Sequence, residues 1–597
     1  MGKRFPRLFV VLSIFLLTSL LTTSTAFSSN ARNELVIISR DTQVFDKDAT
    51  VLDFPITIVR FGHGVSVGEI VNFKINGNEL YDKIEKSQAI DVHRIDDAID
   101  HTDFKQWMEY RKNVSILKIR NDDELLLSMA KDHGVNLTHA INKLRDQTTG
   151  ILPSPILVDV TDLPFSLSSD MILTVEITVE SGKDHVTWEG EALIVDIEPL
   201  SVNPVWTPAD LHLHTAFSDG AYAPSGYTTQ LNSKGYKLAY IVDEPVGWGI
   251  TQTGFTPKMS GTGNPATNSQ LPSNRYDRLP YLATWAQYRD GVRSASTVNV
   301  GLFPGAEISA SNQEFSHNGV HNGHALAYGI VNLTGSTLFD TTGLRYNWFL
   351  PNTVLKNINL NNSGVSSSSL AHVYSLFYPW NVWGSSLTER YDGMELMSAG
   401  QFNFSPSQSA MVKWRQELLH RLPGVFNNQG FPSARTGSDY DGHLLTPYDL
   451  SYYTYIGLPS LPSDMRNLSQ QSVDVALREG RTIVSRLGGV AALRLKDSSG
   501  TYYEVGSRYS MPVSSIVEGD VVLRAAVTGQ YRVRVIEDDF RRTVHDSSRR
   551  LNAGETVVIP ISFSYPGSNR FYHTIVEHSS IFYNDTIYSS PIFIRQQ

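Results

Sequence analysis

The clearest chemical signal in the chain is the alternation of acidic, apolar and imidazole side chains at Asp210, His212 and His214. Residues two apart on a strand point to the same side, so both imidazoles face one way while Leu211 and Leu213 face the other. Two histidines that converge from the end of one strand form half of a site for zinc, manganese or iron. Such a pair is common by itself, so a metal site requires further ligands elsewhere in the chain.

Further residues of the right chemical type follow in order along the chain. They are Asp219 in a turn, Glu307 in FPGAEIS, His324 in NGHALAYG, His372 in SSSLAHVYS and Asp439 in RTGSDYDGH. Each lies at or just after an apolar run that precedes a loop, where barrel enzymes place their chemistry. His317 and His321 share the loop of His324, but only His324 has both a preceding glycine and a following apolar strand. We therefore expect His324 to be the ligand of the three.

The ordered set ADLHLHTAFSDG, YIVDE, FPGAEIS, GHALAYG, LAHVYS and GSDYDGH resembles the motifs of the PHP (polymerase and histidinol phosphatase) superfamily. Within that superfamily it is most similar to the CehA/McbA-like branch of metallohydrolases. The resemblance covers residues 206–489, roughly half of the chain. The tail VALREGRTIVSR and the β-rich C-terminal region also look like that branch.

The resemblance implies an α/β fold, a distorted (β/α)7 barrel that holds two or three divalent ions of zinc, manganese or iron. Carried over by position, His212, His214 and Asp439 would bind one ion. Glu307 would bridge to a second ion held by His324 and His372, and Glu307 and Asp439 are the expected catalytic residues. A bridging carboxylate is chemically reasonable, because two nearby cations need an anion between them and together lower the pKa of shared water.

This chain departs from the family pattern at the usual third metal site. It has IVDE where the family carries ITDH, and Asp441 where the family carries a histidine, so Glu244 and Asp441 stand beside Asp219. Three oxygen ligands suit Mn²⁺, Mg²⁺ or Ca²⁺ better than zinc. Alternatively the third site is empty, or His443 enters it. Arg435 is either a contact for an anionic substrate or an ordinary surface arginine.

The rest of the chain divides by pattern into four segments. Residues 1–26 have the charged, apolar and small-residue order of a signal peptide, which predicts export to a periplasmic or extracellular location without a transmembrane anchor. Residues 27–204 mix strand and helix patterns and predict an α+β accessory domain. In 205–490 strands and helices alternate, as in the barrel. In 491–597 apolar residues alternate with period two in short runs separated by turn residues, which predicts a β-sandwich.

Composition restricts the function further. The formal charge is −10 and there is no cysteine, so we expect no nucleic-acid partner, no disulfide and no thiolate ligand. Phosphate-binding loops and dinucleotide fingerprints are absent from the sequence. The leading hypothesis is hydrolysis of a small-molecule phosphoester, carboxyl ester, carbamate or amide, by a metal-bridging hydroxide. The alternative is a non-catalytic binding protein that uses the same barrel to hold a metal or a ligand.

Overall fold

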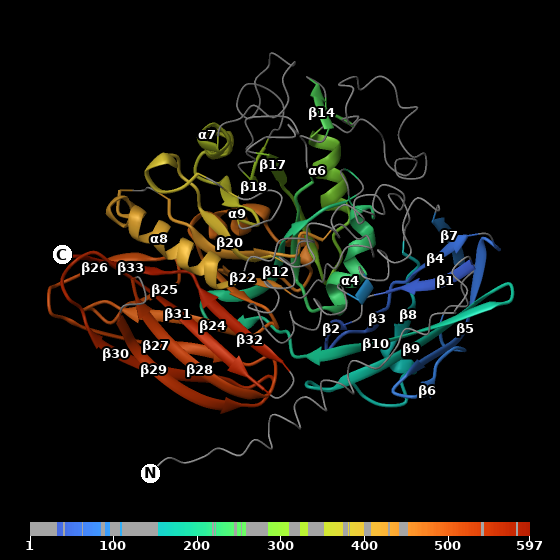
Figure 1. The fold of residues 1–597 in the computed structure, drawn as a ribbon. Helices are drawn as coiled ribbons and strands as arrows, with labels where there is room; N and C mark the ends of the chain where they lie inside the picture. Colours follow the sequence, from blue (N-terminus) through green and yellow to red (C-terminus); the bar gives the residue numbers. More distant parts are fainter. Residues whose placement is uncertain are drawn as a thin grey trace, which may run out of the picture.

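The computed structural model describes most of the chain after residue 32. The described residues are 33–39, 42–62, 64–84, 90–95, 108–109, 153–215, 217, 220, 222–243, 248–251, 254–257, 285–309, 323–331, 351–373, 380, 382–398, 407–427, 430–440, 452–538, 542–580 and 583–597. The expected signal peptide lies outside them. In Figure 1 the N-terminal strands and the C-terminal strands lie on either side of the central part of the chain. No helix in these ranges is long and apolar enough to cross a membrane.

The N-terminal part is built mainly of strands. Its largest sheet has the order β1 (Asn33–Ile38), β4 (Thr57–Gly62), β7 (Ile90–Ile95), β5 (Val67–Ile75), β9 (Ile172–Ser181), β10 (Asp184–Val195) and β2 (Thr42–Asp46), with β6 (Asn78–Glu79) beside β5. A second pair joins β3 (Val51–Asp53) to β8 (Leu157–Asp159). β9 buries every second residue, as expected for a strand with one covered face. Its buried apolar residues belong to an N-terminal core that is separate from the core of the central and C-terminal strands. The run DDELLLSMAKDHG predicts a helix over 122–134, which lies outside the described residues.

The central part begins with three parallel strands. They are β12 (Val205–Leu213), β13 (Leu238–Ile241) and β16 (Gly301–Pro304). Every residue of β13 and β16 is buried, as expected for strands with both faces covered. After Gly305 the chain changes sheet and forms β17 (Ala306–Ser309). A Cβ at position 305 would lie 2.7 Å from the Ala327 carbonyl oxygen, so glycine permits this close approach.

A second central sheet continues from β17 through β18 (His324–Tyr328), β19 (Ser367–Leu370), β20 (Gly393–Ser398) and β21 (Ser433–Gly437). β18 runs antiparallel to both of its neighbours, which departs from the regular alternation of strands and helices in a (β/α)7 barrel. Just beyond β21, Tyr440 pairs with Leu213 of β12, and the His214 N–H donates to the Tyr440 carbonyl oxygen at 3.0 Å. The two central sheets therefore contact each other at both of their ends.

The described α-helices lie near the positions that the sequence predicts, except the helix over Pro351–Asn361, which the sequence analysis does not predict. They are α4 (Thr228–Ser233), α6 (Trp285–Ser294), α7 (Pro351–Asn361), α8 (Ser407–Val425) and α9 (Gln470–Arg478). α8 was expected to end at Pro423, but Pro423 lies inside it. The segment 251–274 was expected to be a loop, but Gly254–Pro257 forms β15, paired with β14 (Trp248–Thr251). The remainder of that segment lies outside the described residues.

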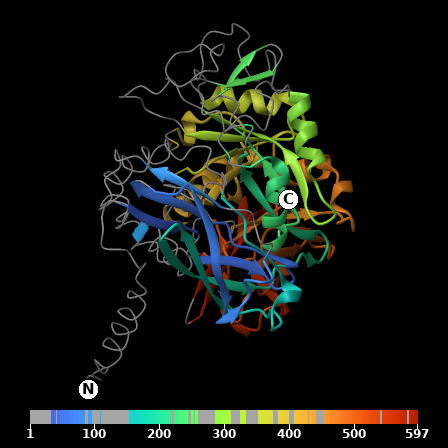
Figure 2. The same cartoon turned by 90° about the vertical axis from the view of Figure 1, so that its right-hand side faces the viewer.

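The C-terminal strands form two sheets, and one of them continues the central sheet. From β12 the order runs through β22 (Tyr453–Leu458), β23 (Thr482–Ser485), β32 (Asn584–Ser589), β31 (Arg570–Ser579) and β28 (Gly529–Glu537) to β29 (Arg542–Leu551). β33 (Ile592–Gln596) pairs with β31 and with β26 (Arg508–Met511). The other sheet is β25 (Tyr502–Glu504), β24 (Val490–Lys496), β27 (Ile516–Arg524) and β30 (Thr556–Ser564). Figure 2 shows these strands on the far side from the N-terminal sheet.

Candidate metal centre

The strand that carries the two histidines has an irregularity where they occur. β12 shifts register against β13 between Asp210 and Leu213, and such bulges re-aim side chains next to functional sites. His212 and His214 are both buried. Asp210 Oδ1 accepts the N–H of His212 and the N–H of Ser438, each at 3.0 Å. Asp210 thereby connects the histidine strand to the segment that carries Asp439.

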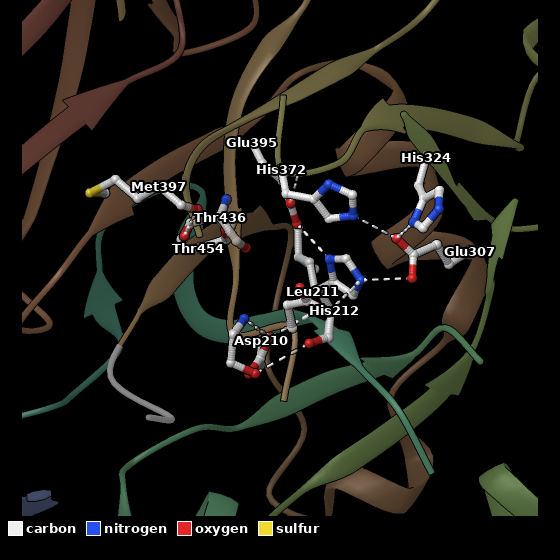
Figure 3. Close-up of polar contacts among 12 residues, drawn as sticks. Asp210, Leu211, His212, Glu307, His324, His372, Glu395, Met397, Thr436 and Thr454 are labelled. Carbon is white, nitrogen blue, oxygen red and sulfur yellow. Dashed lines mark hydrogen bonds and ion pairs between the residues drawn. The ribbon is translucent and has the colours of Figure 1, made fainter. Parts of the chain in front are cut away.

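Glu307 lies at the centre of a cluster of four imidazoles. Its Oε2 is 3.3 Å from His212 Nε2 and 3.1 Å from His214 Nε2. Its Oε1 is 2.7 Å from His324 Nδ1 and 3.0 Å from His372 Nε2. Figure 3 shows one oxygen of the Glu307 carboxylate directed at His212 and the other directed at His372 and His324. One carboxylate therefore faces two separate groups of nitrogen ligands.

Six of the residues expected at the site are brought together in two groups that share Glu307. One group is His212, His214, Glu307 and Asp439, and the other is Glu307, His324 and His372, with the ligand atoms of each group within 4.8 Å of one another. Asp439 Oδ1 completes the first group, 3.4 Å from His212 Nε2 and 3.3 Å from His214 Nε2.

The direction of the strands explains why these residues meet. His214, His372 and Asp439 follow the carboxyl ends of β12, β19 and β21, whereas His324 is the first residue of β18. Because β18 runs antiparallel to β17 and β19, its first residue lies at the same end of the sheet as their last residues. Because of this reversed direction, the start of β18 places His324 at the same end of the sheet as the other residues of the cluster.

The spacing of the first group fits a four-coordinate ion. Metal–nitrogen and metal–oxygen bonds of about 2.0–2.1 Å in a tetrahedron separate neighbouring ligand atoms by roughly 3.3–3.4 Å. The four measured separations between the histidine nitrogens and the carboxylate oxygens run from 3.1 to 3.4 Å. His212 Nε2 is also buried without a well-directed hydrogen bond. The residues present therefore suit a divalent cation held by nitrogen and oxygen.

The electrostatics of the cluster favour a cation at its centre. Burial alone would raise the pKa of Glu307, but the adjacent imidazoles of His324 and His212 hold it well below its ordinary value. Burial alone would lower the pKa of His212, but the carboxylates around it raise that pKa well above the ordinary value. Burial likewise opposes ionisation of Asp439, whose pKa is nonetheless lowered by His212 and His214. The carboxylates thus remain ionised, and the buried cluster attracts positive charge.

Two of the ligands have an unusual backbone conformation. His372 has φ of 28° and Asp439 has φ of 51°, a region that side chains other than glycine rarely occupy. Gly323, which precedes His324, has φ of 78°, where glycine carries no penalty. Backbone strain of this kind concentrates at functional sites and persists where the surroundings enforce it.

Two positioning contacts were missed by the sequence reasoning. Glu395 on β20 is buried, its Oε1 lies 3.0 Å from His212 Nδ1, and its Oε2 accepts the N–H of His372 at 2.7 Å. Asp243 accepts both the N–H and the hydroxyl of Thr215, at 2.7 and 2.6 Å. The available signal was an acidic residue inside an apolar run for Glu395 (GMELMS) and directly after one for Asp243 (YIVD).

Of the remaining site predictions, only Arg435 lies within the described residues. Asp219, Glu244, Asp441 and His443 lie outside the described residues, as do His317 and His321. Arg435 is fully buried, with its guanidinium donating to the Ser367 hydroxyl and the Leu477 carbonyl oxygen at 2.8 and 2.7 Å. The structure therefore places Arg435 in the interior rather than at a surface or beside a substrate.

Comparisons with known proteins give only distant similarities. No protein-family model matches the chain, and no curated protein matches it either. Among solved structures, the chain is similar to a two-domain protein from Bacteroides vulgatus containing a predicted PHP-like metal-dependent phosphoesterase. That match has 12% identity and a TM-score of 0.32, and covers 64% of this chain and 93% of the other. A predicted metal-dependent phosphoesterase from Bifidobacterium adolescentis matches at 13% identity and a TM-score of 0.23, covering 41% and 91%.

Proposed function

We propose that this chain is an exported hydrolase of the PHP type that depends on divalent metal ions. The observation that carries the proposal is the pair of ligand groups that share the Glu307 carboxylate. A binding protein that held a single ion would need only one group. Two groups separated by one carboxylate are the arrangement used by hydrolases with paired ions.

The strand pairing supports the barrel that the sequence motifs suggest. Hydrogen bonds connect β12 to β13, β13 to β16, and β17 through β18, β19 and β20 to β21. The contact of Tyr440 with the end of β12 then closes the ring. With β16 and β17 counted as one strand interrupted at Gly305, we propose that these strands are the distorted seven-stranded PHP barrel, in the CehA/McbA-like branch, with a separate β-sandwich at 491–597.

Each residue of the cluster has a part in the proposed reaction. His212, His214 and Asp439 would hold one ion, His324 and His372 the other, and Glu307 both. Divalent ions bound there would lower the pKa of water and stabilise negative charge that develops on a substrate oxygen. The buried residues keep bulk water away from the ligand atoms, and this strengthens every charge interaction inside the site. The scissile group would be a phosphoester, a carboxyl ester, a carbamate or an amide.

A reconstitution experiment tests this proposal. The protein is stripped with a chelator, reloaded with Mn²⁺ or Zn²⁺, and assayed with an aryl phosphate, an aryl carboxyl ester and an aryl carbamate. We expect two or more ions per chain by inductively coupled plasma mass spectrometry, and turnover of at least one substrate that disappears on chelation and returns on reloading. Bound metal without turnover of any substrate would favour the non-catalytic binding protein. Absence of bound metal would reject the hydrolase and a metal-binding role, and would leave only a protein that binds a ligand without metal.

A further inference from the structure

The buried carboxylate of Glu395 touches both ligand groups. Its Oε1 lies 3.0 Å from Nδ1 of His212, a ligand of the first group. Its Oε2 accepts the backbone N–H of His372, a ligand of the second group, at 2.7 Å. Figure 3 shows Glu395 above His212, on the opposite side of that imidazole from Glu307. A single side chain thus contacts one ligand from each half of the site.

An irregularity in β20 and a glycine in β21 allow the Glu395 side chain to reach His212 and His372. β20 shifts register against β21 between Glu395 and Met397, and the bulge turns the side chains on either side of it. The Thr436 hydroxyl donates to the Met397 carbonyl oxygen at 2.5 Å and thereby stabilises the irregular segment. A Cβ added at Gly437 would lie 2.3 Å from His212 Cβ and 3.0 Å from Glu395 Oε1, so only glycine leaves room for the pair.

We propose that Glu395 is a positioning residue that prepares both ligand groups by fixing the tautomer of His212 and the backbone of His372. This inference rests on the proposed metal centre. An ionised carboxylate accepts hydrogen bonds and cannot donate them, so His212 Nδ1 carries the hydrogen. In the neutral ring that can bind a metal, the lone pair of His212 is then on Nε2, which faces Glu307 and Asp439. Carboxylate–histidine pairs of this kind also increase the basicity of a ligand.

The contact with His372 acts on the second group in a different way. The His372 backbone has φ of 28°, and strained conformations need surrounding contacts to hold them. The short hydrogen bond from the His372 N–H to Glu395 is such a contact. This hydrogen bond thereby orients the His372 imidazole toward Glu307, whose Oε1 lies 3.0 Å from His372 Nε2.

The Glu395→Gln substitution distinguishes a positioning role of this side chain from a packing role. It keeps the side-chain volume but replaces one hydrogen-bond acceptor with a donor. If the amide oxygen still accepts the His372 N–H, the amide N–H₂ faces His212 Nδ1 and can only donate. That arrangement favours hydrogen on His212 Nε2, where the metal should bind. We therefore expect the affinity of the first group to fall about 10- to 100-fold, the range found for outer-shell partners of ligating histidines.

Glu417 provides a matched control. It is also buried, and its two oxygens accept the Gly384 N–H and the Tyr391 hydroxyl, each at 2.9 Å. The Glu417→Gln variant thus loses a comparable acceptor while none of these contacts involves a ligand of the cluster. Both variants should lose some thermal stability in the metal-free state, but only Glu395→Gln should lose metal affinity.

The test measures Co²⁺ binding by calorimetric titration and by the visible absorption of the bound ion, which reports ligand geometry. Weaker binding of one equivalent and an altered spectrum in Glu395→Gln, with Glu417→Gln unchanged, would support the inference. Wild-type affinity and spectrum in Glu395→Gln would overturn it.

If that variant does not fold, Glu395→Asp keeps the charge but is too short to span both contacts, and it should show the same loss. Wild-type protein that binds two ions without turnover would reject the hydrolase and leave this test intact, whereas wild-type protein that binds none would reject both.

Discussion

Buried carboxylates occur in the metal-binding cluster and also around the C-terminal sheets, and the two regions differ in the partners of those carboxylates. Around the C-terminal sheets the partners are guanidinium groups, as for Asp520 with Arg494, Asp196 with Arg524 and Asp538 with Arg570. In the described part of the chain, every ion-pair partner of Glu307 is a histidine.

The difference matters because the two cations behave differently. Arginine remains charged at any physiological pH, so an arginine–carboxylate pair is already neutral. Imidazole is ordinarily neutral near pH 7 and offers a lone pair to a metal instead. A buried carboxylate surrounded by imidazoles therefore leaves negative charge and nitrogen lone pairs for an added ion. In these examples a guanidinium partner marks the carboxylates around the C-terminal sheets, whereas imidazole partners mark those of the cluster and its surroundings, Glu307 and Glu395.

The largest expected effect of this difference is at Glu307. Glu307→Gln removes the shared charge and leaves both groups with a neutral ligand, so both ions should bind more weakly. We expect activity to fall by about 100-fold or more, at or beyond the upper end of the effect of outer-shell partners. Metal content after dialysis, measured by inductively coupled plasma mass spectrometry, checks the cause. Unchanged metal content would exclude a bridging role for Glu307.

A smaller effect concerns pH. The carboxylates around His212 hold its pKa well above the ordinary value in the metal-free protein, so a metal must displace a proton from this imidazole up to a higher pH than for an unperturbed histidine. Metal affinity should therefore rise with pH until that raised pKa is passed, and binding should release protons. Calorimetry at pH 7 in two buffers of different ionisation enthalpy measures the release. Equal heats in both buffers would mean that His212 is already neutral.

The smallest of the three effects is expected in the C-terminal sheets. Asp520→Asn leaves the guanidinium of Arg494 without its charged acceptor, which lies 2.7 Å away, and the free energy of unfolding should fall by roughly 1–3 kcal/mol. Denaturant unfolding measures that loss. Metal content should stay at the wild-type value. Loss of metal as large as in Glu307→Gln would show that the distinction between the two regions is false.

Much of the local structure could be predicted from the sequence. The strand of His212, the buried strand at 238–241 and the period-two strands after residue 515 follow from hydrophobic period alone. The six clustered ligands were found because each ends or begins an apolar run. The reversal of β18, the bulge beside Glu395 and the role of Asp243 were not predicted, because they depend on pairing between distant strands. Arg435 was misplaced for the same reason, since its acceptors Ser367 and Leu477 are far away in sequence.

The continuous hydrogen bonding from β22 through β23 to β32 has a practical consequence. Ile483, Val484 and Ser485 of β23 pair with Ser589, Tyr588 and Ile587 of β32, so the C-terminal strands cover one long side of β23. A protein shortened at residue 490 would expose that side as a bare edge with unpaired N–H and carbonyl groups. Such edges recruit strands from other molecules and promote aggregation. The half of this chain that carries the cluster should therefore be studied together with its C-terminal strands.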